Sequence, residues 1–416
     1  MWMMRLVGDE LQESDEICNK CASVLLRDAL LFWSGPYKDG GTVPDMEFSD
    51  NSRALFDYML QEGMNERWEL IWLVSNPKKY EARYSAVKNV LFLSARAAES
   101  TDEGIREEYF TALYSARFIF TTDGYGFAAD ARPGQTRVQL WHGCGIKSRV
   151  HFGRMEHNYE FMTVSSRFYQ KRHAEIFGLQ DDQVLLTGLP KNDLLFHPIM
   201  DWREQLGIPC CGKYVFWLPT FRTTYLHGME HLNESIHEGS ETGLPIVDSV
   251  AQVEELERLL AACDMCLVIK LHPFQERKHI LLENSRHIHL LENGCLADNF
   301  LQVEHILGHA DALISDYSSV AVSYCILDRP IAFTLDDCEE YGQHRGFHWR
   351  NVRDYLPGTE IVNFAGFCRF IQEISEGQDT SWEKRKRLMP IFHEYRDDQS
   401  SARVLSNFGI TRGRKI

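Results

Sequence analysis

The stretch Glu69-Leu-Ile-Trp-Leu-Val74 is a short apolar run of the kind that forms a buried strand. Runs of this kind recur along the chain, and amphipathic stretches with helical periodicity separate them. Because parallel strands need a crossover helix between them, this alternation predicts an α/β protein with parallel sheets. The further runs are residues 89–93, 116–122 and 137–141 in a first series, and residues 213–219, 266–271, 288–291, 312–315 and 330–333 in a second.

Two domains are expected from the length and from the gap between the two series. The chain has 416 residues, which exceeds what one hydrophobic core usually serves. The gap contains the turn-forming run Gly207-Ile-Pro-Cys-Cys-Gly212. We therefore expect domains at residues 1–207 and 208–416, each a doubly wound Rossmann-like sheet facing a central cleft. Such sheets bind ligands at the carboxyl ends of their strands, so chemistry is expected in the strand-to-helix loops.

The charge balance excludes broad classes of partner. There are 60 acidic and 44 basic residues, and the formal net charge is −16. Such a surface repels nucleic acid and anionic lipid, so an anionic substrate needs a local basic pocket. One basic cluster stands out against this background, although a solvated helix face is the usual role of such a run. The cluster contains Lys147, Arg149, Arg154, Arg167, Lys171 and Arg172.

The eleven cysteines are scattered and do not form the dense framework of a small secreted domain. We expect reduced thiols in a cytoplasmic protein. Two C-x-x-C pairs, Cys18/Cys21 and Cys263/Cys266, lie too far apart in the chain to predict a zinc site by themselves. The start turns acidic too early for a secretory signal, and no stretch approaches the roughly 18 apolar residues of a spanning helix.

Two histidines follow predicted strands at equivalent positions of the two domains. His142 comes directly after the run 137–141, and Gly143 beyond it lets backbone approach a ligand closely. His272 follows the run 266–271, and Pro273 fixes the chain beyond it. One such histidine alone is more often part of an ordinary turn, whereas two equivalent ones favour a functional role.

Phosphate-binding features follow two other strands of the second series. After the run 312–315, Asp316, Ser318 and Ser319 open the next helix, where hydroxyl and backbone N–H groups can cradle a phosphate. Ordinary N-capping is the alternative role for these residues. Arg222 follows the run 213–219, and its planar guanidinium suits bidentate phosphate binding, with a surface ion pair as the alternative.

Taken in order, these motifs resemble the CDP-glycerol glycerophosphotransferases of teichoic acid and capsule synthesis. The likeness runs from Phe48-Ser-Asp-Asn-Ser52 to Pro357-Gly358 and covers most of the chain. Each string is weak alone, but five in the same order are specific. The strings are Trp141-His-Gly143, Thr187-Gly-Leu-Pro-Lys-Asn-Asp193, Pro219-Thr-Phe-Arg222, His272-Pro273 and Ser315-Asp-Tyr-Ser-Ser-Val320, followed by Asp328-Arg-Pro-Ile331, Tyr341 and Arg345-Gly-Phe347.

The resemblance implies the GT-B plan, with an acceptor-side N-terminal domain, a nucleotide-binding C-terminal domain and final helices that pack back toward the first. It implies that an acceptor hydroxyl attacks the β-phosphorus of CDP-glycerol, so that glycerol phosphate is transferred and CMP leaves. His142 and His272 match the catalytic histidines, and we expect His142 to be the general base. The implied donor-binding residues are Arg222, Asp316, Ser318, Ser319, Pro219 and Thr220. The implied acceptor-binding residues are Gly143, Lys147, Arg149, Lys191, Asn192 and Asp193.

The chain contains no P-loop and no clustered carboxylate pair, so we expect no obligatory cofactor, with Asp316 as the one candidate ligand for Mg²⁺. The implied partners are a nucleotide-activated polyol and a glycan or lipid-linked acceptor, without nucleic acid. The run Cys144-Gly-Ile-Lys-Ser148 stands where the family usually has Thr-Pro-Leu-Lys-Lys, which indicates a different acceptor or polyol. The acidic balance predicts only weak attachment at the inner face of the plasma membrane.

Three alternatives stay open at this point. CDP-ribitol is the first, because glycerol and ribitol enzymes share these motifs. A GT-B nucleotide-sugar transferase or epimerase would keep the two domains but lack the combined His-Gly and Ser-Asp-Tyr-Ser-Ser set. A degenerate binding subunit of a polymer-assembling complex would have no need of both histidines.

Overall fold

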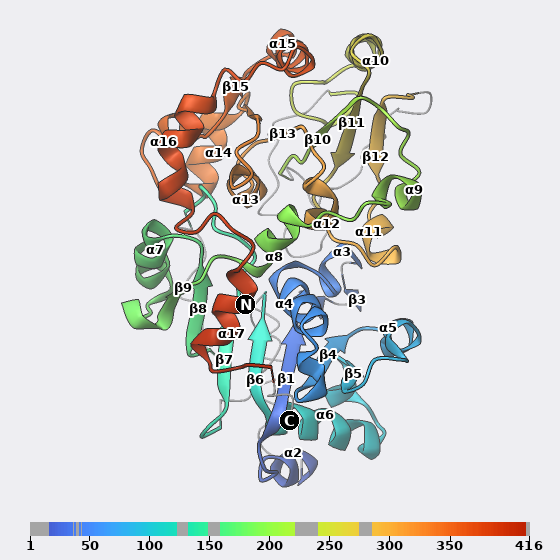
Figure 1. The fold of residues 1–416 in the computed structure, drawn as a ribbon, viewed down its shortest axis with the longest axis vertical. Helices are drawn as coiled ribbons and strands as arrows, with labels where there is room; N and C mark the ends of the chain where they lie inside the picture. The colour runs from blue at the N-terminus through green and yellow to red at the C-terminus, as the bar shows by residue number, and fades with distance from the viewer. Residues whose placement is uncertain are drawn as a thin grey trace.

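The computed structural model describes residues 16–35, 37–38, 41–42, 44–122, 132–148, 159–220, 240–273 and 285–412. Two parallel sheets dominate it, one in the lower and one in the upper part of Figure 1. They have no strand in common, and the predicted α/β class is confirmed. We call the part around the first sheet the first half and the part around the second sheet the second half. The predicted domain boundary near residue 208 lies between the last strand of one sheet and the first strand of the other.

The first sheet has seven parallel strands in the order β5-β4-β1-β6-β7-β8-β9. Its central strand β1 continues to β4 on one side, and the chain later crosses to β6 on the other side. This reversal is the topological switch point of a doubly wound sheet. The strands are β1 (Arg27–Trp33), β4 (Glu69–Val74), β5 (Val90–Ser94), β6 (Ala116–Thr121), β7 (Thr136–Gln139), β8 (Phe161–Val164) and β9 (Val184–Leu186).

The second sheet repeats this plan with six parallel strands in the order β12-β11-β10-β13-β14-β15. Its switch point lies between β10 and β13. All six residues of β11 are buried, which explains why this strand is a continuous apolar run rather than an alternating one. The strands are β10 (Lys213–Trp217), β11 (Met265–Lys270), β12 (Ile288–Leu291), β13 (Ala312–Ser315), β14 (Ile331–Thr334) and β15 (Thr359–Ile361).

Helices cover both faces of each sheet (Figure 1). A separate two-stranded hairpin, β2 (Tyr37–Lys38) with β3 (Gly41–Thr42), lies beside α3. The helices of the first half are α2 (Glu16–Cys21), α3 (Pro44–Glu47), α4 (Asp50–Gln61), α5 (Pro77–Tyr84), α6 (Glu103–Ser115), α7 (Arg167–Phe177) and α8 (Pro190–Asp193). The helix α9 (Trp202–Leu206) packs on the second sheet (Figure 1), where Trp202 contacts Tyr214 and Phe216 of β10. The later helices are α10 (Val250–Ala262), α11 (Cys295–Asp298), α12 (Val303–Leu307), α13 (Ser319–Cys325), α14 (Cys338–Arg345), α15 (Phe364–Ser375), α16 (Trp382–Phe392) and α17 (Ser400–Asn407).

One hydrophobic core extends through both halves. It includes Met162 of β8 and Phe177 of α7 together with Phe333 of β14 and Phe392 of α16. The two halves are therefore packed against each other by apolar side chains as well as by the polar contacts described below.

The last helix, α17, returns to the first half, beside β7 in Figure 1. Its Val404 and Leu405 are buried in the same core cluster as Phe118 and Phe120 of β6. The chain thus crosses between the halves a second time before it ends, and one face of the first sheet is completed by residues from its far end.

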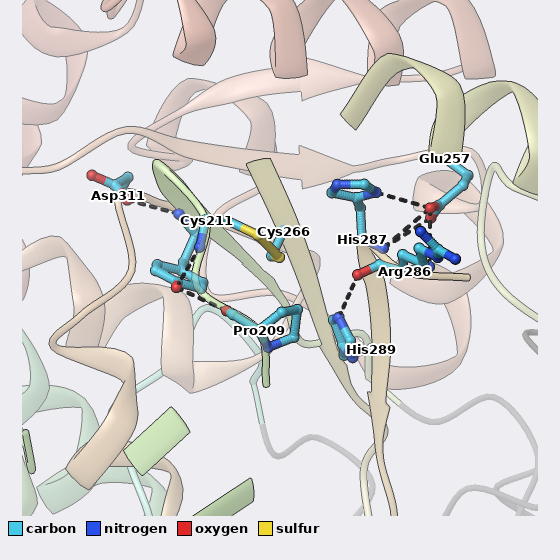
Figure 2. The surroundings of a disulfide bond; sticks show 9 residues. Pro209, Cys211, Glu257, Cys266, Arg286, His287, His289 and Asp311 are labelled. Carbon is cyan, nitrogen blue, oxygen red and sulfur yellow. Dashed lines mark hydrogen bonds and ion pairs between the residues drawn. A yellow bond between two sulfur atoms is a disulfide. The ribbon is translucent and has the colours of Figure 1, made fainter. Parts of the chain in front are cut away.

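Cys211 and Cys266 are joined in a disulfide, which Figure 2 shows between the segment before β10 and the strand β11. The Tyr214 hydroxyl, which accepts from the Cys211 N–H, donates in turn to the Pro209 carbonyl at 3.0 Å. The expectation that every cysteine is a free thiol is therefore wrong for this pair. Sequence spacing did not indicate it, because the two residues meet only through the pairing of β10 with β11.

Two further sequence expectations concern metals and membranes. Among the described residues, no group of three His, Cys, Asp or Glu side chains could hold a metal ion. The same residues contain no helix that is long and apolar enough to cross a bilayer.

Candidate active site at the strand ends

The loops after β10 and β13 are locked together at the switch point of the second sheet. Asp316, fully buried after β13, accepts from the Thr220 backbone N–H at 2.8 Å and from the Thr220 hydroxyl at 2.5 Å. The Ser315 hydroxyl donates to the Leu218 carbonyl at 2.8 Å. Both oxygens of the Asp316 carboxylate are thus engaged by the neighbouring loop. This arrangement shapes the predicted donor side, which also includes the buried Pro219.

Ser318 and Ser319 stand where the next helix, α13, begins. The Ser318 side chain accepts from the Val320 backbone N–H at 3.4 Å and so caps the helix. Ser318 therefore fills the ordinary capping role that the sequence left open as an alternative. Between these residues and β13, the fully buried Tyr317 donates its hydroxyl to Asp337 at 2.7 Å and fixes the start of the helix.

The His142 loop, residues 140–148, follows β7 of the first sheet. Trp141 has a φ of +60°, a left-handed conformation that is strained for a bulky residue. The Asn51 side chain donates to the Trp141 carbonyl at 2.7 Å and holds this conformation. His142 itself is exposed, and its ring lies against the Trp141 indole with 4.1 Å between the ring centroids.

The His142 loop reaches the second half at the start of α13. A Cβ atom on Gly143 would lie 2.5 Å from the Oγ of Ser319, and one on Gly145 would lie 3.2 Å from the Ser319 Cβ. Two motifs that are far apart in the sequence, the His-Gly motif and the Ser-Asp-Tyr-Ser-Ser motif, are therefore in direct contact.

The end of the same loop pairs with a short segment that follows α14. Lys147 forms an isolated antiparallel bridge with Phe347. The Ser148 N–H donates to the Gly346 carbonyl at 3.2 Å, and the His348 N–H donates to the Ile146 carbonyl at 3.0 Å. These contacts place the Arg-Gly-Phe motif against the end of the His142 loop.

Lys191 of α8 is buried between the two halves. Its Nζ atom lies 3.0 Å from Asp50 Oδ2, 3.4 Å from Glu304 Oε1 of α12 and 2.9 Å from the His142 carbonyl oxygen. Burial opposes the charge, yet the carboxylates of Asp50 and Glu304 raise the pKa of Lys191 to about 12. The ammonium is therefore protonated throughout the physiological range.

Lys191, Asn192 and Asp193 are 5%, 1% and 7% exposed. The Asp193 carboxylate accepts from the backbone N–H groups of Ser400 and Ser401, at 2.9 and 2.8 Å, and caps α17. The side chains of these three residues are thus buried inside the protein, and their assignment to the acceptor stays a prediction.

The second histidine motif is also anchored between the halves. His272 is half-buried and follows β11, the neighbour of β10 whose end carries Thr220. Two residues earlier, the buried Lys270 ammonium lies 2.8 Å from the carboxylate of Asp45, which belongs to α3 of the first half. The Lys270 ammonium also donates to the Leu271 carbonyl at 3.2 Å. Each histidine thus lies beside a buried lysine that joins the two halves.

Arg222, Arg149 and Arg154 lie outside the described residues. Within the rest of the basic cluster, Arg167 forms an exposed ion pair with Glu394 at 3.1 Å, and Arg172 forms one with Glu175 at 2.9 Å. These two residues have the solvated role that is usual for a charge run.

Sequence reasoning did not identify the residues that hold the histidine loops. Asp45, Asp50 and Asn51 all come from the segment around the Phe48-Ser-Asp-Asn-Ser52 motif, which was noted only as part of a resemblance. In the structure, α4 begins above the switch point of the first sheet, where Ser52 donates to the Trp33 carbonyl at 2.9 Å. This motif was the signal that could have identified these residues, but the spacing of its residues does not by itself predict a role for them.

Comparisons with known proteins agree with this geometry. Residues 42–408 match the model of the family described as CDP-Glycerol:Poly(glycerophosphate) glycerophosphotransferase. The teichoic acid ribitol-phosphate polymerase TarK of Staphylococcus aureus is 26% identical over 71% of this chain and 56% of its own length. The teichoic acid glycerol-phosphate transferase of the same organism is 24% identical over 86% of this chain and 89% of its own length. The chain spans about half the length of the polymerases that it matches, 56%, 52% and 45% in three cases.

Solved structures show the same fold. The wall teichoic acid polymerase TagF superposes with a TM-score of 0.69 at 18% identity, covering 97% of this chain and 95% of that one. This likeness confirms the predicted GT-B arrangement of two Rossmann-like sheets. Because the family model matches nearly the whole chain, we conclude that the protein belongs to the CDP-glycerol:poly(glycerophosphate) glycerophosphotransferase family.

Proposed function

We propose that this chain transfers glycerol phosphate from CDP-glycerol to a hydroxyl group of a glycan or polyol-phosphate acceptor and releases CMP. In this reaction the acceptor oxygen forms a bond to the β-phosphorus while the bond from that phosphorus to the bridging oxygen breaks. The observation that carries the proposal is the contact of Gly143 with Ser319, because it brings the His-Gly motif of one sheet to the Ser-Asp-Tyr-Ser-Ser motif of the other.

In this proposal His142 removes the proton from the attacking hydroxyl. The residue is exposed at a strand end, and its backbone carbonyl is held by Lys191. Phosphoryl transfer depends mainly on in-line positioning and on neutralising charge, so a fixed loop is as important as the base itself. Gly143 and Lys147 then border the acceptor, and Arg149 is assigned the same role from the resemblance.

The donor is proposed to bind over the ends of β10, β11 and β13. The backbone around Thr220 is fixed by Asp316, and Ser319 faces the His142 loop. His272 and Arg222 would stabilise the pyrophosphate and the departing CMP, on the strength of the family motifs. The proposed reaction has no obligatory cofactor.

The proposed setting is the synthesis of a cell-envelope polymer, teichoic acid or capsule, in the cytoplasm. The acceptor would be a glycan, either free or lipid-linked, reached by weak peripheral contact with the inner face of the plasma membrane. The acidic balance of −16 supports weak rather than strong attachment to anionic lipid.

CDP-ribitol is the second candidate donor. It is favoured by the matches to TarK and to a teichoic acid poly(ribitol-phosphate) polymerase of Bacillus spizizenii, which is 25% identical over 75% of this chain. A donor screen distinguishes the candidate donors. Titration calorimetry measures the binding of CDP-glycerol, CDP-ribitol and UDP-N-acetylglucosamine, and an assay of CMP release with mass detection of the product then measures transfer. CMP release from either CDP-polyol supports the family reaction, whereas binding without release indicates a binding subunit. No binding of either CDP-polyol refutes the proposal.

A further inference from the structure

All three donor groups of the Lys191 ammonium have acceptors. Two are carboxylates from different halves of the molecule, Asp50 on α4 at 3.0 Å and Glu304 on α12 at 3.4 Å. The third is the backbone carbonyl of His142 at 2.9 Å. An ammonium group has three N–H bonds and no acceptor, so this set uses its full capacity.

The backbone of Lys191 is tied to the same loop through Asn51. The Lys191 N–H donates to Asn51 Oδ1 at 3.0 Å, and the Asn51 amide donates to the Trp141 carbonyl at 2.7 Å. The two carbonyl groups before Gly143 are therefore fixed by one connected set of residues, which we call the Lys191 cluster: Lys191, Asp50, Asn51 and Glu304. It holds the loop at the point where Trp141 is strained.

A buried charge is a costly way to fasten a loop if stability is all that is required. Desolvating an ammonium group and two carboxylates is unfavourable, and apolar residues of similar volume often replace such groups without loss of stability. What an apolar side chain cannot do is donate a hydrogen bond to the His142 carbonyl while joining two halves of the molecule. The charged Lys191 side chain thus fixes the backbone position of the loop that carries the proposed base.

We propose that Lys191 is a positioning residue for the transfer reaction. Its ammonium fixes the backbone of His142 and, through Glu304, ties that position to α12 of the second half. This inference rests on the proposed function for its catalytic consequence, although its structural part, the ordering of residues 140–148, does not.

The test compares three variants of the full chain. Lys191→Met removes the charge and all three hydrogen bonds. Asp50→Asn removes one charge but keeps the size and an acceptor oxygen, so Lys191 stays balanced by Glu304. Arg385→Met is the matched control, because the buried Arg385 makes an equivalent pair of ionic contacts inside the second half, with Asp328 at 2.9 Å and Asp379 at 2.5 Å.

Two measurements are made on each variant: steady-state CMP release with CDP-glycerol binding by calorimetry, and hydrogen exchange of the peptide covering residues 140–148. For Lys191→Met we expect kcat to fall about a hundredfold, as displaced catalytic groups typically cause, with donor affinity unchanged. Exchange in residues 140–148 should accelerate in this variant. Asp50→Asn should lie between Lys191→Met and the unchanged protein in both measurements. Arg385→Met should lower the melting temperature while leaving kcat and the exchange of the His142 loop unchanged.

The outcomes separate this inference from the proposed function. If the unaltered protein releases no CMP from a CDP-polyol, the proposed function fails and the exchange measurement alone decides the structural part. If Lys191→Met leaves kcat or the exchange of residues 140–148 unchanged, the positioning role is refuted. If Arg385→Met slows turnover as much as Lys191→Met does, the effect is general destabilisation and the inference is overturned.

Discussion

Gly143 lies so close to Ser319 that a Cβ atom on the glycine would stand 2.5 Å from the serine Oγ. The glycine also has a φ of +145°, a backbone conformation that other residues rarely adopt. The two constraints on Gly143 are independent. One is the backbone conformation of its own loop, and the other is the steric contact with Ser319 of the second half. The contact therefore requires glycine at this position for both steric and conformational reasons.

Gly143→Ala is expected to push the His142 loop away from α13 and to lower CMP release strongly. Backbone strain alone costs about 1–3 kcal/mol, and the clash adds to it. Gly207→Ala is the control, because Gly207 has a φ of +66° but no atom within 4 Å of the added carbon. Both variants should melt earlier than the unaltered protein, but only Gly143→Ala should lose turnover. Equal turnover in the two variants would contradict the requirement for close contact.

His142→Ala tests the base. Removing a general base typically lowers the rate by about 10²–10⁴-fold, and we expect a loss of kcat in that range. Calorimetry should show unchanged binding of CDP-glycerol, since the proposed donor site belongs to the second sheet. Near-normal turnover of this variant with the donor bound would exclude His142 as the base.

His393 should make the protein less stable in acid. The residue is 4% exposed, and its Nε2 lies 2.6 Å from the Val322 carbonyl oxygen. Burial lowers the pKa of His393 to about 4 from the ordinary 6.5. Between pH 6.5 and about 4 the imidazole binds a proton in the unfolded chain but not in the folded one. The free energy of unfolding therefore falls as the pH decreases through this range, and His393 contributes about 3 kcal/mol to the fall.

The measurement is denaturant unfolding across that pH range for the unaltered protein and for His393→Gln, which keeps a hydrogen-bond donor but does not titrate. The difference between the two pH slopes isolates His393 from other buried histidines such as His305, whose pKa burial lowers to about 3. Identical slopes in the two proteins would show that His393 is protonated in the folded state.

Asp193→Ala should loosen α17. The substitution leaves the N–H groups of Ser400 and Ser401 without their acceptors, which costs about 1–3 kcal/mol for buried groups. Hydrogen exchange in α17 is expected to accelerate. Asp102→Ala is the control, because Asp102 caps α6 through the Gly104 N–H at 2.8 Å, and it should leave α17 unchanged. Unchanged exchange in Asp193→Ala would mean that apolar packing alone holds the helix.

Most of the strands could be predicted because buried parallel strands are continuous apolar runs. The runs at β4, β12 and β13 were predicted with the bounds that the structure has. The central strand β1 was missed although its residues 29–33 form a continuous apolar run of the same kind, and no family motif lies in that part of the chain. The strands β9 and β15 were also missed, because three residues carry too little pattern. The strand β8 was missed although it has four residues, as many as β12 and β13.

The candidate site divides along a similar line. His142, His272 and Asp316 could be found because each follows a recognisable strand, and the sheet topology brings strand ends together. The roles of Asp50 and Glu304 could not be found, because their meeting at Lys191 depends on how the two halves pack. For the same reason the burial of the Thr-Gly-Leu-Pro-Lys-Asn-Asp motif could not be predicted, and its assignment to the acceptor stays a prediction.

The return of α17 to the first sheet has a consequence for the synthesis of the protein. A ribosome delivers β1 to β9 before any of the second half, yet Val404, Leu405 and Ile410 complete the core on one face of that first sheet. Phe118 and Phe120 consequently lack part of their apolar cover, including the Phe408 ring, until translation has passed residue 410. A chain that stalls after α16 presents this apolar face to chaperones and to other unfinished chains, so the first half reaches its native state only after the second half has been made.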